Sequence, residues 1–144
     1  MAQSSSPDEI WKPFGAFSQI VVGGDGQLVH LKGQVSLDKD GVIVGAADMS
    51  VQVNQVLSNI KALLEVMNGR MSDVTTLHQF TTDIEAFMTT GHIRQVFFQP
   101  PYPVTTTVEV KSLYDSQLLI EITATAEIPN SRFVRPTNAL VMHR

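Results

Sequence analysis

The sequence predicts one α+β domain in which a mixed β-sheet carries two helices on a single face. The length of 144 residues fits one domain with a hydrophobic core of ordinary size. Apolar residues recur with helical spacing in the middle of the chain and alternate with polar residues on either side of it. These observations predict the element order ββαβαββ.

Two apolar stretches open the domain and predict a β-hairpin. They are Ile20 to Val22 and Leu28 to Val35, and residues 23–26 between them contain three glycines and one aspartate. Such residues accept the positive φ angles of a tight turn.

The first helix is predicted over Ser50 to Asn68. Asp48 or Ser50 is its candidate N-cap, and Gly69 is its candidate C-cap. Apolar residues spaced by three and four place one buried stripe along it: Val53, Val56, Leu57, Ile60, Leu63, Leu64 and Met67.

The second half of the chain predicts a strand, a helix and two further strands. Residues 74–81 alternate with period two, and a helix is expected from Asp83 until shortly before Pro100. Its expected buried residues are Ile84, Phe87, Met88, Val96 and Phe97. The last two strands are expected over Val104 to Lys111 and Leu118 to Ile128.

Two helices can cover one face of this sheet, so the other face is left without a helix. It is expected to hold Thr105, Thr107, Glu109, Leu119 and Glu121, while Thr106 turns inward. The mixture of polar and apolar groups indicates either a subunit interface or a solvated face. Residues 1–13 are expected to form an N-terminal extension, and residues 129–144 a C-terminal arm that is either mobile or laid on a neighbour.

Composition and charge argue against several functional classes. The net charge is −4 and the ten Lys and Arg are scattered singly, so no nucleic-acid-binding surface is expected. No membrane span or export signal is expected. The absence of cysteine excludes thiol chemistry and slightly favours the cytoplasm. The histidines (His30, His78, His92 and His143) are far apart in sequence, so no metal site and no cofactor are expected.

Several local strings resemble the RidA/YjgF family of reactive-intermediate deaminases. The strings are GAFSQIV, KGQVSLD, the helix QVNQVLSNIKALLEVMNGRMSDV, PPYPVTTTVEV and LIEITATAEIP. They occur in the family's order within residues 14–128. The resemblance implies an α+β fold of the chorismate mutase-like type and a homotrimer with small-molecule sites in the clefts between subunits.

The resemblance also implies which residues line such a cleft. Glu121 matches the glutamate thought to activate the attacking water in an imine deaminase. The substrate-binding positions map onto Phe17, Lys32, Gly33, Thr105 and Thr107. The family's carboxylate-binding arginine falls on Thr105, which cannot form a bidentate ionic pair, so this sequence predicts weakened binding of carboxylates.

Two functions stay open on these grounds. The protein is either an imine or enamine hydrolase with an altered substrate, or a non-catalytic trimeric protein that binds or senses a small molecule. Nuclease activity, which is attached to some relatives, is disfavoured by the acidic charge. Lys32 could replace the lost positive charge, pair with Glu121, or lie in solvent.

Overall fold

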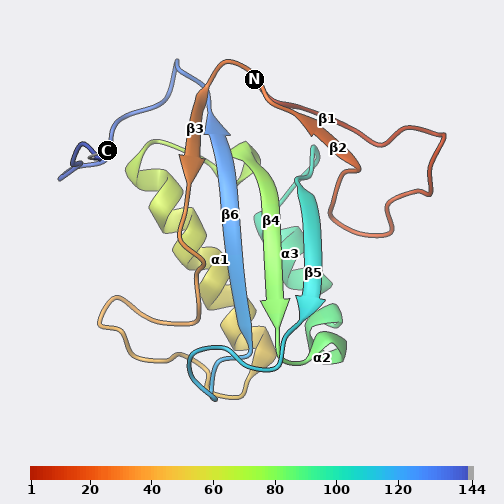
Figure 1. Ribbon diagram of the computed structural model, residues 1–144, viewed down its shortest axis with the longest axis vertical. Helices are drawn as coiled ribbons and strands as arrows, with labels where there is room; N and C mark the ends of the chain where they lie inside the picture. The colour runs from red at the N-terminus through yellow and green to blue at the C-terminus, as the bar shows by residue number, and fades with distance from the viewer. Residues whose placement is uncertain (143–144) are drawn as a thin grey trace.

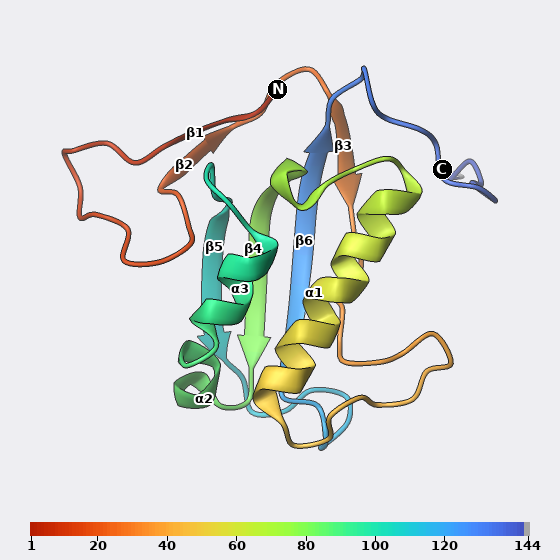
Figure 2. The ribbon, with the colours of Figure 1, turned by 180° about the vertical axis from the view of Figure 1, so that it is seen from behind.

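A computed structural model describes residues 1–142 and confirms the α+β fold class. Its main sheet has the strand order β3-β6-β4-β5, in which β4 is parallel to β5 and antiparallel to β6, and β3 is antiparallel to β6. The strands are β3 (Gln27–His30), β4 (Val74–Thr81), β5 (Val104–Glu109) and β6 (Ile120–Ile128). All three α-helices lie behind this sheet in Figure 1 and in front of it in Figure 2, so one face is covered and the other is open.

Helix α1 (Met49–Val66) confirms the strongest prediction from the sequence. Asp48 is its N-cap, and the carboxylate accepts a hydrogen bond of 3.2 Å from the Val51 amide. Most of the predicted stripe is buried against β6, although Leu63 is exposed. The left-handed residue after the helix is Asn68 (φ 60°) rather than Gly69. Gly69 is needed for space, since a Cβ there would collide with Ile128.

The single second helix expected from the sequence is two short helices, α2 (Ile84–Met88) and α3 (Gly91–Phe97). Asp83 caps α2 as expected through the Ala86 amide. The break follows from the Thr89 and Thr90 hydroxyls, which donate to the carbonyls of Ala86 (2.7 Å) and Phe87 (2.6 Å). Met88, the last residue of α2, is exposed and not buried as predicted. Val96 is also exposed, because the helical phase restarts in α3 after the break.

The predicted hairpin between residues 20–22 and 28–35 is wrong. Strand β2 (Ile20–Val22) pairs instead with β1 (Gln3–Ser5), within the segment expected to be an extension. Figure 1 shows this pair on the β5 side of the sheet, whereas β3 forms the opposite edge. The glycine turn is fixed to β6, because the Glu127 carboxylate accepts from the amides of Gly24 (2.7 Å) and Gly26 (3.1 Å).

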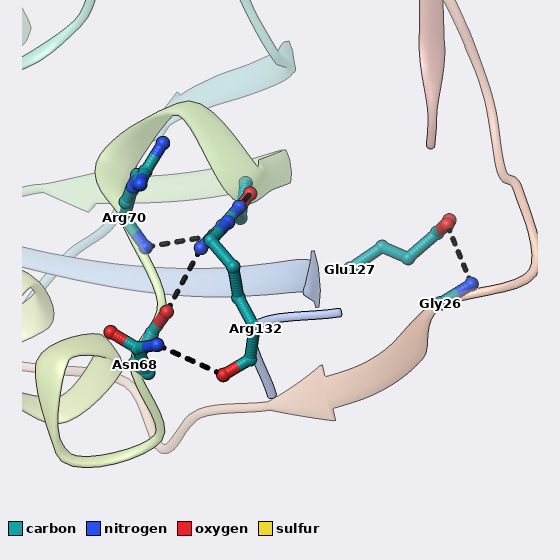
Figure 3. A network of polar contacts seen from close by, with 6 residues as sticks. Gly26, Asn68, Arg70, Glu127 and Arg132 are labelled. Atoms are coloured by element: carbon teal, nitrogen blue, oxygen red, sulfur yellow. Dashed lines mark hydrogen bonds and ion pairs between the residues drawn. The ribbon is translucent and has the colours of Figure 1, made fainter. Parts of the chain in front are cut away.

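The first part of the C-terminal arm lies against its own chain. The Arg132 guanidinium forms an ion pair of 2.6 Å with Asp73, and donates to the Asn68 carbonyl at 2.9 Å. The Asn68 amide returns a hydrogen bond of 3.0 Å to the Arg132 carbonyl, as Figure 3 shows. The Val134 amide also donates to Met67. The arm is therefore attached as far as this residue.

We expect Gln52→Leu to destabilise the fold by roughly 2–4 kcal/mol. The Gln52 side chain is fully buried and donates to the carbonyls of Gly45 (2.9 Å) and Gln117 (2.7 Å), and it accepts from the Leu119 amide (2.8 Å). Leucine would leave these three backbone groups without partners. Urea unfolding measures the change. The exposed Gln99→Leu is the matched control and should stay within about 0.5 kcal/mol of wild type.

Candidate functional site

The threonines of β5 lie on the helix-covered face, which corrects the orientation predicted from the sequence. Strand β5 pairs Thr105 with Leu77 and Thr107 with Gln79, both of which are buried. The Gln79 amide donates to the Thr107 hydroxyl at 2.8 Å, which fixes this orientation. The residue that faces the open side is Thr106, contrary to the prediction that it turns inward.

The prediction failed because β5 is an edge strand whose buried neighbour is polar. Val104 and Val108 led to the expectation that their face points into the core, but that face is the open one. Glu109 also lies on the covered side, where its carboxylate accepts a hydrogen bond of 3.0 Å from the Ile84 amide at the start of α2. The burial of alternate residues is a weak guide at an edge strand that is covered by short helices.

Glu121 lies on the open face of β6 and packs directly against Gly33. It pairs with Phe80 across β4, while its neighbours Ile120 and Ile122 are buried beneath α1. The backbone of Gln34 pairs with Ile122 through hydrogen bonds of 2.8 and 3.0 Å, which brings residue 33 beside the Glu121 side chain. A Cβ at position 33 would collide with the carboxylate, so the close approach requires glycine.

Lys32 is exposed, and the described residues 1–142 contain no ion pair between it and Glu121. In one chain, therefore, this lysine is not paired with the glutamate, and it does not line the pocket that contains Thr105. Of the three roles considered for it, the solvated one describes the single chain.

A pocket of about 590 Å³ lies on the other side of the sheet, between the loop of residues 11–19, helix α3 and strand β5. Phe17, Thr105 and Thr107 line it. The loop is fixed to β5 by a hydrogen bond of 2.9 Å from the Ser18 amide to the Pro103 carbonyl. Phe17 packs edge-on against Phe14 (5.2 Å between ring centroids) and Trp11 (5.9 Å), so one wall is aromatic.

The same pocket contains Arg94, a residue that sequence reasoning missed. Its guanidinium Nη1 donates to the Gln79 side-chain oxygen at 3.3 Å, and its Cζ lies 5.5 Å from the centre of the Phe87 ring. Burial lowers the pKa of this guanidinium below its usual value. A single arginine in a short helix offers no sequence signal, because its role depends on contacts with β4.

The structure therefore divides the predicted site into two halves. Gly33 and Glu121 meet on the open face, whereas Phe17, Thr105 and Thr107 line a pocket on the covered side. Within one chain the sheet separates the two halves. Among residues 1–142 no group of three or more His, Cys, Asp or Glu side chains is placed to share a metal ion. No helix in this part of the chain is long and apolar enough to cross a membrane.

Comparison with known proteins places the chain among small proteins of one family. The family model described as endoribonuclease L-PSP matches residues 8–128. A RutC family protein of Pyrococcus horikoshii is 34% identical over 116 residues, which cover 80% of this chain and 89% of the relative. A 2-iminobutanoate/2-iminopropanoate deaminase of Dermatophagoides farinae is 29% identical over 102 residues, covering 71% of this chain and 78% of the relative.

Solved structures agree with this result. A protein of the conserved Rid family from Yersinia pestis superimposes with a TM-score of 0.80 at 27% identity, covering 88% of this chain and 98% of that one. RidA from an Antarctic Psychrobacter gives a TM-score of 0.65, also at 27% identity, covering 88% of this chain and 99% of that one.

The two adjacent threonines of β5 provide a test of the face assignment. We expect Thr107→Val to cost about 1–2 kcal/mol, since the buried Gln79 amide loses its acceptor. Thr106→Val, the same change on the open face, should cost nothing measurable, because valine suits a strand as well as threonine does. Thermal unfolding measures the stability of both variants. Equal losses of stability would contradict the assignment of Thr107 to the covered face and Thr106 to the open face.

Proposed function

The chain belongs to the RidA/YjgF family, and we propose that it hydrolyses small imines or enamines at a site shared between neighbouring copies. The observation that supports this proposal most directly is the Glu121 carboxylate held against Gly33, on a sheet face that no helix of residues 1–142 covers. The mite relative is named for the deamination of two 2-imino acids, which is a reaction of this class.

The proposed reaction needs one water molecule and one base. The water oxygen attacks the imine carbon while Glu121 accepts a proton from it. That proton passes to the nitrogen and gives a carbinolamine, which carries one hydroxyl and one amino group. The hydroxyl proton then moves by way of Glu121 to the same nitrogen, the carbon–nitrogen bond breaks, and ammonia leaves as the carbonyl forms. One imine and one water thus give one carbonyl compound and one ammonia, with no change of oxidation state. Gly33 packs against the Glu121 carboxylate, so its backbone is the candidate group to help orient the water or the imine.

The open sheet face is the proposed contact between copies in a homotrimer. Exposed or half-buried apolar groups, including Leu28, Phe80 and Val108, are mixed there with polar ones. An uncovered face of this composition is typical of a subunit interface. Assembly would set the Gly33–Glu121 half of one copy beside the Phe17–Thr105–Thr107 pocket of the next, and so join the two halves that one chain keeps apart.

A non-catalytic role in ligand binding is the second candidate. The observation that favours it is Thr105, which stands where the resemblance places the arginine that binds the substrate carboxylate. Such a protein would keep the pocket and the assembly without turnover. The activity of a Glu121 variant separates the two candidates.

We expect Glu121→Gln to lower imine hydrolysis at least about a hundredfold, because the amide cannot accept the proton. An amino-acid oxidase generates 2-iminobutanoate from 2-aminobutanoate, and the release of ammonia or 2-oxobutanoate is followed. Glu65→Gln, an exposed position on α1, is the matched control and should keep wild-type activity. Equal hydrolysis by wild type and Glu121→Gln would refute the proposed role of Glu121, and the absence of hydrolysis by wild type would refute the proposed chemistry and leave the binding role.

Light scattering at micromolar concentration should give about three times the chain mass of 15.8 kDa. Phe80→Glu, on the open face beside Glu121, should shift the mass towards the monomer by placing unpaired like charges in the contact. A wild-type mass of one chain would contradict the trimer.

A further inference from the structure

We propose that Arg94 binds the anionic group of the ligand, so that helix α3 supplies the guanidinium that Thr105 lacks. The pocket then takes a small carboxylate with a short apolar tail. This inference rests on the proposed function and deepens it by naming the residue that binds the anionic group of the substrate. The binding of an anion, however, can be tested without any turnover.

Arg94, Gln79 and Thr107 form a row of hydrogen bonds in which each side chain donates to the next. A guanidinium only donates, so the Gln79 side chain must turn its oxygen towards Arg94 and its amino group away from it. That amino group donates to the Thr107 hydroxyl, whose oxygen is therefore occupied as an acceptor. The hydroxyl hydrogen of Thr107 is left to donate to another group. The Arg94 guanidinium and the Thr107 hydroxyl thus both present hydrogen-bond donors to the pocket where a ligand would lie.

The positive charge of Arg94 has no carboxylate beside it in the described chain. No salt bridge within residues 1–142 includes Arg94, and neither Asp nor Glu lines the pocket. Its Nε is enclosed and makes no hydrogen bond in this part of the chain. Taking a charge partly out of water without an ionic partner is costly, and a bound carboxylate would offset that cost.

The ring of Phe87 explains how the side chain keeps this position without a carboxylate. Phe87 is buried at the end of α2, and the Arg94 Cζ lies over its ring, 5.5 Å from the centre. The face of an aromatic ring attracts a cation, so this contact stabilises the charged guanidinium without an ionic partner. This contact and the Gln79 hydrogen bond hold Arg94 at the pocket before any ligand arrives, which lowers the cost of ordering it on binding.

The small residue at position 105 complements the arginine on α3. Thr105 and Arg94 line the same pocket, one from β5 and the other from α3. A second guanidinium at position 105 would enter the same space and repel the first. Lys32, the other candidate for the missing charge, is exposed near Glu121 and does not line this pocket. Of these two cations, Arg94 is therefore the one placed beside Thr105.

The aromatic wall limits the rest of the ligand. Phe17 lines the pocket and is supported by Phe14 and Trp11, so the part of the ligand beyond its carboxylate meets an apolar surface. At about 590 Å³, the pocket has the size of those that hold small metabolites. A short-chain 2-oxo or 2-imino acid matches both the charge and the wall.

The test is calorimetric titration of the full-length protein with 2-oxobutanoate and with its neutral isostere 2-oxobutanamide. We expect wild type to bind the acid at least about tenfold more tightly than the amide. Arg94→Met should weaken binding of the acid at least about tenfold and leave the amide unaffected. Arg94→Lys should fall between, because it keeps the charge and loses the planar fork. Equal affinities for acid and amide in wild type, or no binding of the acid, would overturn the proposal.

Arg135→Met is the matched control. Arg135 is exposed and its guanidinium also stacks on an aromatic ring, that of Phe133 at 5.9 Å, but it lies outside the pocket. This variant removes the same charge and should bind like wild type; loss of affinity equal to that of Arg94→Met would show a mere effect of net charge and overturn the proposal. If Arg94→Met does not fold, the proposal is tested by the ratio of the affinities for the acid and the amide, measured for wild type and for Arg94→Lys.

The outcome also separates this inference from the proposed function. Glu121→Gln should still bind 2-oxobutanoate more tightly than 2-oxobutanamide, since the base is not the anion-binding group. Binding that depends on Arg94, without any imine hydrolysis by wild type, would support the anion site and reject the deaminase. Imine hydrolysis that is unchanged in Arg94→Met would support the deaminase and overturn the role of Arg94.

Discussion

The central position of β6 between β3 and β4 decides where every candidate functional group lies. Hydrogen bonds on both edges fix its register, and its alternate residues from Ile120 to Ile128 are fully buried under α1. A shift by one residue would exchange the two faces of the strand and bury Glu121, so burial and register enforce each other. The carboxylate must therefore face the open side, and the short helices must cover the side where Thr105 and Thr107 lie.

The parts of the fold that sequence predicts well are those with a strong and uninterrupted period. Strand β6 buries one side completely and helix α1 buries nearly all of its apolar stripe, so their limits and orientation follow from counting apolar residues. The predicted hairpin is wrong because an apolar stretch shows that a strand forms but does not show which strand it pairs with. Here the glycine turn binds Glu127, and β2 pairs with residues 3–5. The orientation of β5 failed because a buried Gln79, and not an apolar residue, covers its inner side.

The candidate site was predictable only in part for a similar reason. Local strings and order place Gly33, Thr105 and Glu121 near or on strands, and the loss of an arginine at 105 can be read directly. What replaces that arginine cannot be read from the sequence. Arg94 becomes relevant because the Thr89–Thr90 break redirects α3, and because Gln79 and Phe87, from two other elements, hold the guanidinium at the pocket.

The sheet keeps the base and the arginine apart within one chain, and this separation has a chemical advantage. Glu121 and Arg94 carry opposite charges, and on the same face they would attract each other and form a salt bridge that occupies both. On opposite faces neither has such a partner among residues 1–142. In the proposed assembly they would approach the ligand from different copies, one at the reacting carbon and the other at the carboxylate. Each group would then find its partner in the substrate and not in the other.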